Sequence, residues 1–147
     1  MGFSLDDAVA LATRAHSGQL DKAGRPYIQH PLRVMAKVDG EHEKMTAVLH
    51  DVIEDTSVTE QELVSLGCPP RVIEAVVAIS KRDGESMADY LARVAADPIA
   101  LAVKHADIAD NSGPERLGRL DPPTQGRLRR KYAESLRLLA QYATTTR

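Results

Sequence analysis

Aromatic residues are scarce in this chain of 147 residues, and tryptophan is absent. With only 3% aromatic residues, the protein offers few rings on which single-stranded bases could stack. A formal net charge of −2 produces no general field that would draw it to nucleic acid or to anionic lipid. We therefore expect neither nucleic acid nor a membrane among its partners.

Cysteine and long apolar runs are also lacking. The single cysteine, Cys68, precludes a disulfide within the chain, and its position between Gly67 and Pro69 indicates a small filler residue. No stretch approaches the length of a membrane span, and the first residues lack the regions of a signal peptide. We expect a cytoplasmic protein. Its length, with 43% hydrophobic and 27% charged residues, fits one globular domain over residues 1–147.

The hydrophobic pattern is helical along the chain. Ser4 with Asp7, and Thr59 with Glu62, are spaced as N-terminal capping pairs of helices. The run at 76–79 resembles a strand, but its neighbours are helical. We predict an all-α fold, a compact bundle of eight or nine helices. Their expected ranges are 5–17, 31–39, 41–55, 59–67 and from 69 through 79, then from about 86, from about 98, and from 122 to about 142.

Residues 49–55, Leu-His-Asp-Val-Ile-Glu-Asp, place one imidazole and three carboxylates in a short apolar segment. His50 and Glu54 are four residues apart, as are Asp51 and Asp55, so a helix would bring these pairs together. Buried charges must be paired with one another or bind a metal. A divalent cation is the simplest explanation of this pattern.

Two further places add residues of the same type. His30 stands directly before Pro31, a proline suited to the first turn of a helix, and Asp107 follows about 50 residues after the 49–55 segment. Imidazoles and carboxylates together suit Mn²⁺, Fe²⁺ or Zn²⁺ better than Ca²⁺. Their distribution over three predicted helices is what a metal site in a bundle core requires.

The order His, His-Asp and a distant Asp resembles the signature of the HD superfamily of metal-dependent phosphohydrolases. Three motifs are similar to those of RelA/SpoT-type (p)ppGpp hydrolase domains. Residues 24–31 resemble their Pro-Tyr-Ile-x-His-Pro element, and residues 49–56 resemble their His-Asp-x-x-Glu-Asp-Thr element. Lys104-x-Ala106-Asp107 with Asn111 resembles their Lys-x-Ala-Asp-x-x-x-Asn element. The short length is similar to that of the stand-alone small alarmone hydrolases.

The resemblance implies removal of the 3′-pyrophosphate from a guanosine alarmone, ppGpp or pppGpp, with Mn²⁺ as the cofactor. It implies four metal ligands: His30, His50, Asp51 and Asp107. It implies that Glu54 and Asp55 position and activate the attacking water. It also implies that Lys104 and Asn111 line the nucleotide or phosphate pocket.

The loop at 18–26 departs from the family pattern, which carries an Arg-Lys pair before Pro-Tyr-Ile. The arginine is missing from its usual place, and Lys22 and Arg25 are the substitutes that the loop offers for binding substrate. A phosphohydrolase acting on NADPH or another nucleotide is therefore one alternative. A non-catalytic, metal-containing nucleotide sensor is another, although a sensor has no need of Glu54 and Asp55.

The remaining polar residues have simpler interpretations. We expect structural or surface roles for His16, His42 and His105. His16 could also support the first loop. Asp110 either replaces Asp107, assists it, or is an exposed carboxylate. The basic run at 127–131 is expected to form a solvated helix face. Arg116 and Arg119 follow Asn111 closely and are better placed to contact a ligand.

Overall fold

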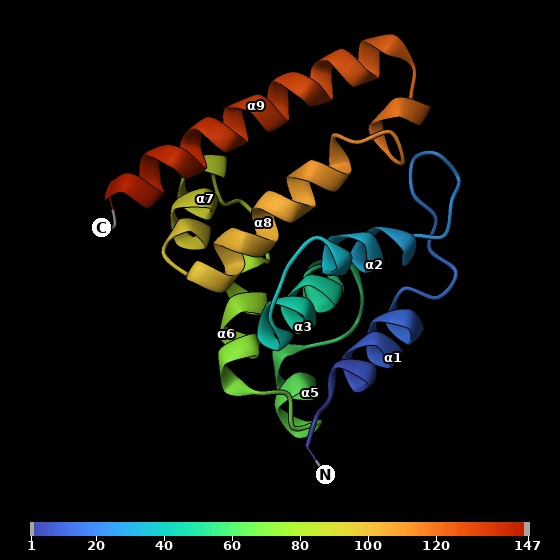
Figure 1. Cartoon of the computed structure of the whole chain (residues 1–147), viewed down its shortest axis with the longest axis vertical. Coiled ribbons are helices and arrows are strands. Elements are labelled where there is room, and N and C mark those ends of the chain that lie inside the picture. The colour runs from blue at the N-terminus through green and yellow to red at the C-terminus, as the bar shows by residue number, and fades with distance from the viewer. Residues whose placement is uncertain (1, 146–147) are drawn as a thin grey trace.

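Helices make up the fold of this protein, which a computed structural model describes for residues 2–145 (Figure 1). Over that range no β-strand is present, and the one extended pairing is an isolated bridge between Leu20 and Pro26. The predicted all-α class is confirmed. In chain order the elements are α1 (Leu5–Ala15), α2 (Gln29–Ala36), α3 (Glu41–Leu49), α4 (Val52–Asp55), α5 (Glu60–Ser65), α6 (Pro70–Ile79), α7 (Met87–Ala95), α8 (Pro98–Asn111), the 3₁₀ turn η1 (Leu117–Arg119) and α9 (Pro122–Thr145).

Local capping signals explain where several helices begin. At α1, the Ser4 hydroxyl accepts a hydrogen bond from the Asp7 backbone, and the Asp7 carboxylate accepts one from the Ser4 backbone. At α5, Thr59 Oγ1 accepts a hydrogen bond from the backbone N–H of Glu62 at 3.1 Å. The Asp97 carboxylate caps α8 in the same way. These contacts pair N–H groups that the first turn of a helix leaves without partners.

The prediction of one continuous helix over residues 41–55 is wrong at its centre. α3 ends at Leu49 and α4 begins at Val52, so His50 and Asp51 form a turn between two helices. The Asp51 backbone lies at φ −104° and ψ 0°, in the sparsely populated region beside the helical one. No Gly or Pro marks this point. Tertiary contacts of the two side chains therefore account for the break.

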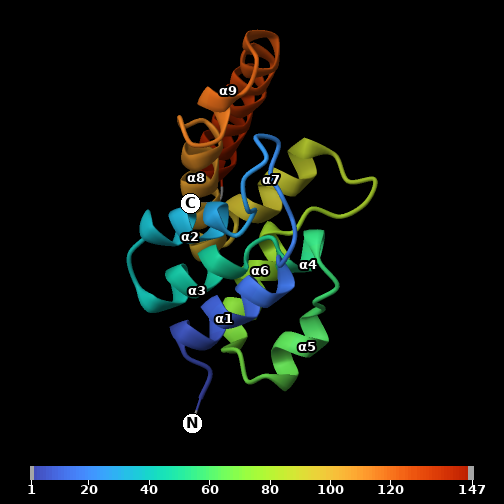
Figure 2. The same ribbon diagram turned by 90° about the vertical axis from the view of Figure 1, so that its right-hand side faces the viewer.

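Two clusters of buried hydrophobic side chains form the core, and α3 contributes to both. Leu49 belongs to the cluster that joins α1, α3, α5 and α6, and Ala47 belongs to the cluster that joins α6, α7, α8 and α9. α3 packs against α1, α2, α6 and α8, while α9 packs on α7 and extends past α8 (Figures 1 and 2). Cys68 is buried in the first cluster, as expected of a filler residue. The end of α3 therefore lies where the two clusters meet.

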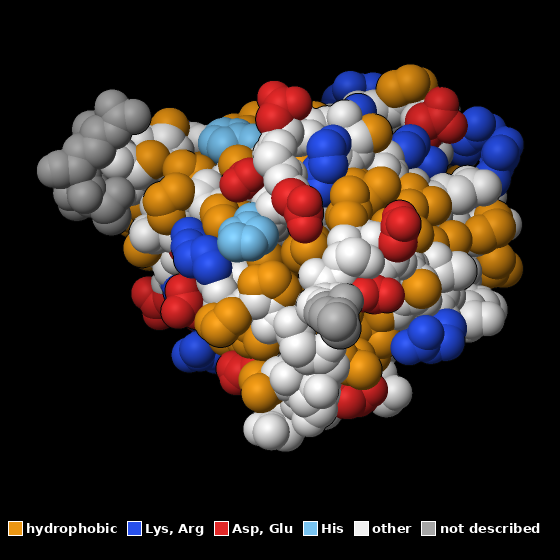
Figure 3. All heavy atoms as spheres, turned by 60° about the horizontal axis from the view of Figure 1, so that its bottom comes forward, with side chains coloured by type: hydrophobic (Ala, Val, Ile, Leu, Met, Phe, Trp, Pro, Cys, Tyr) orange, Lys and Arg blue, Asp and Glu red, His pale blue; other side chains and the backbone are white. Residues whose placement is uncertain are grey.

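The surface carries charge of both signs. On the face shown in Figure 3, acidic, basic and hydrophobic side chains are interspersed. This mixture agrees with the small net charge of the chain. Within residues 2–145, none of the helices combines the length and the apolar character needed to cross a bilayer.

Candidate metal centre

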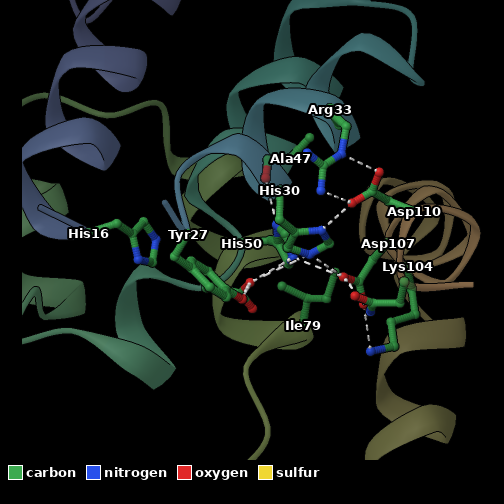
Figure 4. A network of polar contacts seen from close by, with 12 residues as sticks. His16, Tyr27, His30, Arg33, Ala47, His50, Ile79, Lys104, Asp107 and Asp110 are labelled. Carbon is green, nitrogen blue, oxygen red and sulfur yellow. Dashed lines mark hydrogen bonds and ion pairs between the residues drawn. The ribbon is translucent and has the colours of Figure 1, made fainter. Parts of the chain in front are cut away.

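Two imidazoles meet one carboxylate in the interior of the protein (Figure 4). His30 lies at the start of α2, His50 directly follows α3, and Asp107 lies on α8. His30 Nε2 is 2.9 Å from Asp107 Oδ1, and His50 Nε2 is 3.2 Å from the same oxygen. One possible ligand atom from each residue lies within 4.8 Å of the other two. All three side chains are buried, so residues far apart in sequence form one polar cluster.

Asp51 joins this cluster from the turn after α3. Its Oδ2 lies 3.1 Å from His50 Nε2 and 3.9 Å from His30 Nε2. The Tyr27 hydroxyl donates a hydrogen bond to the same oxygen at 2.5 Å, which holds the carboxylate beside the imidazoles. Neighbouring side chains on a continuous helix point about 100° apart. The turn at His50 and Asp51 lets both of them reach the site.

His50 is oriented through its other ring nitrogen. Its Nδ1 donates a hydrogen bond to the carbonyl oxygen of Ala47 at 2.6 Å. When the ring is neutral, the proton therefore resides on Nδ1, and the lone pair of Nε2 points towards Asp51 and Asp107. A backbone carbonyl in this position fixes the tautomer that a metal-binding histidine needs.

His30 is oriented by a carboxylate that the sequence left ambiguous. His30 Nδ1 donates a hydrogen bond to Asp110 Oδ2 at 2.6 Å, and Arg33 binds both oxygens of Asp110. Asp110 is buried and supports the cluster, so the alternative of an exposed carboxylate is wrong. Its place three residues after Asp107, on the same helix face, was the available signal. Sequence reasoning gave no role to Arg33.

Burial and charge pairing oppose each other within the cluster. Burial disfavours the charged form of His50, yet Asp51 and Asp107 raise its pKa well above the usual value. Burial would raise the pKa of Asp107, yet Lys104 and the two imidazoles lower it well below the usual value. Against burial, His50 likewise lowers the pKa of Asp51 to about 2. Asp51 and Asp107 therefore favour the protonated form of His50, and a divalent cation can take the place of that proton.

Metal binding is therefore expected to release the proton held by His50 Nε2 at neutral pH. Below the raised pKa of His50 the ring is protonated, so apparent metal affinity should rise as the pH rises, by up to about tenfold per unit. Titration calorimetry with Mn²⁺ in two buffers of different ionisation enthalpy measures the protons released. A heat of binding that does not depend on the buffer would contradict this protonation state.

Glu54 and Asp55 follow the cluster by one helical turn. The Asp55 backbone N–H donates to the Asp51 carbonyl at 2.9 Å, so the two aspartates lie on one side of α4. Burial, followed by the charges of Asp51 and Glu54, raises the pKa of Asp55 to about 6. A carboxylate with such a pKa is suited to accept a proton near neutral pH. Glu54 accepts a hydrogen bond from the Lys81 backbone at 2.7 Å.

A cavity of about 150 Å³ adjoins the cluster, between α4, α7, α8 and α9. Lys104 Nζ donates to Asp107 Oδ2 at 3.0 Å, and Asn111 Nδ2 lies 3.2 Å from Asp107 Oδ1. Lys104 and Asn111, which were predicted to line the substrate pocket, therefore border both the cluster and the cavity. Lys131 is exposed, as predicted for the basic run at 127–131, and it also lines this cavity. Its pKa is lowered by burial and by Lys104 and Lys22. The polar residues lining the cavity are Glu54, Lys81, Tyr90, Lys104, Asn111, Lys131, Tyr132 and Ser135.

A smaller cavity, of about 40 Å³, lies beside the loop at 18–26. It shares Asn111 and Tyr132 with the larger cavity, and Lys22 and Arg116 also line it. Arg25 is exposed and is not among the residues that line either cavity. Of the two substitutes predicted in the loop, Lys22 shares a cavity with Asn111, another predicted substrate residue, and Arg25 does not.

The other three histidines lie outside the cluster, as the sequence predicted. His42 and His105 are exposed. His16 is buried, and its Nδ1 lies 2.9 Å from Gln19 Oε1. Gln19 Nε2 donates to the Asp55 carbonyl at 3.0 Å, so Oε1 is left to accept from His16. His16 therefore supports the first loop and, through Gln19, connects it to the end of α4.

Curated proteins with similar sequences include (p)ppGpp hydrolases and GTP pyrophosphokinases. The chain is 33% identical to the bifunctional (p)ppGpp synthase/hydrolase SpoT of Escherichia coli over 145 residues, covering 88% of this chain and 20% of that protein. It is 34% identical to the guanosine-3′,5′-bis(diphosphate) 3′-pyrophosphohydrolase of Haemophilus influenzae, covering 84% of this chain and 20% of that one. The chain is a relative of the RelA/SpoT proteins. The resemblance predicted from its three motifs is confirmed.

The likeness to RelA/SpoT proteins extends to the fold. A solved structure, described as a metazoan ortholog of SpoT that hydrolyses ppGpp, matches with a TM-score of 0.72 at 22% identity. The match covers 97% of this chain and 92% of that one. A scan of the chain against protein-family models found no match. The chain spans about a fifth of the length of the curated RelA/SpoT relatives named above.

Proposed function

We propose that this protein is a Mn²⁺-dependent phosphohydrolase that removes the 3′-pyrophosphate from ppGpp or pppGpp. The observation that carries the proposal is the convergence of His30, His50, Asp51 and Asp107 beside a cavity lined with lysines. The names of the two relatives from Escherichia coli and Haemophilus influenzae refer to (p)ppGpp hydrolysis and support the choice of substrate.

The cluster suits a divalent cation of the Mn²⁺ type. Two imidazole nitrogens and two carboxylates form a mixed nitrogen and oxygen set, and both rings have the orientation that metal binding needs. When bound, such a cation supplies Lewis acidity towards phosphoryl oxygens and lowers the pKa of a nearby water. His30, His50, Asp51 and Asp107 are the proposed ligands.

The chain's own residues supply the remaining chemistry. Asp55 is the proposed base, because its raised pKa lets it take a proton from the attacking water. Glu54, one residue before it and held by the Lys81 backbone, helps to position that water. Lys104 presents a compact positive charge, already beside Asp107, to the phosphate oxygens. Asn111 borders both cavities and is proposed to contact the substrate.

A panel of nucleotides tests the proposal. The purified protein with Mn²⁺ is incubated with ppGpp, pppGpp, NADPH, GTP and ATP, and the products are separated by chromatography. We expect GDP and pyrophosphate from ppGpp, and GTP and pyrophosphate from pppGpp. Release of orthophosphate from NADPH, without turnover of either alarmone, would favour the alternative phosphohydrolase. Binding of a nucleotide with no product would favour the sensor.

A further inference from the structure

Within the described residues 2–145, the guanidinium of Arg116 has no anionic partner, although its side chain is only partly exposed. Among residues 2–145, no carboxylate lies within ion-pair distance of it, and its Cζ rests over the ring of Tyr27, 5.4 Å from the centroid. Arg119, which the sequence also placed near a ligand, is exposed, lines neither cavity and pairs with Glu115. A guanidinium carries five N–H donors, and an aromatic face satisfies none of them by a conventional hydrogen bond. The donors of Arg116 are therefore available to a ligand.

The surroundings of Arg116 favour an anion. It lines the 40 Å³ cavity together with Lys22, from the loop at 18–26, and Asn111, from α8. Asp21 is the carboxylate of this cavity, but its Oδ1 accepts hydrogen bonds from the backbone N–H groups of Ala23 and Arg25. The Asp21 carboxylate is thus engaged with its own loop. With Lys22 and Arg116 against this one carboxylate, the lining of the cavity keeps a net positive charge.

Shared residues connect the small cavity to the cluster of His30, His50, Asp51 and Asp107. Asn111 and Tyr132 line both cavities. The ring of Tyr27, on which Arg116 rests, carries the hydroxyl that donates to Asp51. The charge of Arg116 also acts on the Asp55 carboxylate. A substrate seated at the cluster therefore lies within reach of the Arg116 side of the site.

We propose that Arg116, assisted by Lys22, binds a phosphate or pyrophosphate group of the substrate and thereby contributes to its selection. A planar guanidinium offers two parallel N–H groups to a pair of phosphate oxygens, which an ammonium group does not. Arg116 supplies this fork from the segment after α8, whereas the arginine of the loop, Arg25, lines neither cavity. The inference rests on the proposed hydrolase function and adds a specificity-determining residue to it.

The test measures binding without turnover, in the Asp55→Asn background at a fixed concentration of free Mn²⁺. Titration calorimetry is carried out with two probes, inorganic pyrophosphate and ppGpp. Adding Arg116→Gln should weaken binding on the order of 10- to 100-fold, the loss expected for charge-assisted hydrogen bonds. Arg116→Lys keeps the charge but not the two parallel N–H donors, so its loss of affinity should be smaller. Arg119→Gln, the matched control on an exposed and already paired arginine, should bind as the parent does.

The binding results separate a failure of the Arg116 proposal from a failure of the proposed function. Unchanged affinity of the Arg116→Gln variant for both probes would overturn the role of Arg116. If the parent binds pyrophosphate but not ppGpp, the proposed substrate is wrong, and the pyrophosphate comparison alone decides about Arg116. If the parent binds neither probe, both proposals fail. If the Arg116→Gln variant does not fold, Arg116→Lys replaces it, and parental affinity in that variant would contradict bidentate binding.

Discussion

Replacing Asp55 with Asn is expected to lower kcat for ppGpp by roughly 10²- to 10⁴-fold, the usual contribution of a general base. An amide has nearly the shape of the carboxylate but cannot take the proton of the attacking water. The bound metal should remain, because Asp55 is not among the four residues that meet in the cluster. Steady-state kinetics with Mn²⁺, together with elemental analysis of the purified variant, measures both effects.

The pH dependence gives the same prediction a second readout. Burial, then Asp51 and Glu54, raise the pKa of Asp55 to about 6, so the wild-type kcat should fall as the pH drops below that value. A bound cation adds positive charge, which lowers the pKa of Asp55, so with metal the fall in kcat should occur at a lower pH. Asp39→Asn, an exposed carboxylate between α2 and α3, is the control and should leave kcat unchanged. A wild-type kcat in Asp55→Asn would remove Asp55 from the mechanism.

Replacing Asp51 with Asn is expected to remove most of the bound metal. The variant keeps an oxygen that can accept the hydrogen bond of the Tyr27 hydroxyl, so the loss reports the charged ligand itself. Changes to residues that merely support a ligand already cost about 10–100-fold in metal affinity, so loss of a ligand should cost at least as much. Metal content by elemental analysis and Mn²⁺ affinity by titration calorimetry measure the effect.

Thermal stability should follow metal occupancy. A ligand at 100 times its Kd stabilises the folded state by roughly 2.7 kcal/mol, which corresponds to a Tm shift of roughly 5–10 °C for a chain of this size. Added Mn²⁺ should therefore raise the Tm of wild type and of Asp39→Asn, but not that of Asp51→Asn at the same concentration. Full metal occupancy in Asp51→Asn would show that Asp51 is not a ligand.

Features encoded by neighbouring residues could be predicted from the sequence. The start of α1 depends on Ser4 and Asp7, and the start of α5 on Thr59, because a helix cap forms within four residues. The motifs around His30, His50 and Asp107 also sufficed to predict that these three residues meet. Each is local, and the family resemblance supplied the long-range link between them.

Features that depend on distant contacts could not be predicted in this way. Asp110 and Arg33 meet across 77 positions of the chain, and nothing near either residue indicates the other. The same holds for Lys131, whose place in the larger cavity follows from the packing of α9 against α7 and α8. The break between α3 and α4 was missed because the apolar pattern runs through it, whereas its cause is the set of contacts around His50 and Asp51.

That two-residue break limits how the site could be transferred to another protein. Grafting the four ligand identities onto an uninterrupted designed helix would direct the adjacent imidazole and carboxylate to different sides, and only one of them would face the intended ion. A successful graft would have to copy the backbone of this corner, the carbonyl of Ala47 and the hydroxyl of Tyr27 along with the ligands. The smallest portable unit is therefore a bent helix pair with its supporting tyrosine, not a sequence motif.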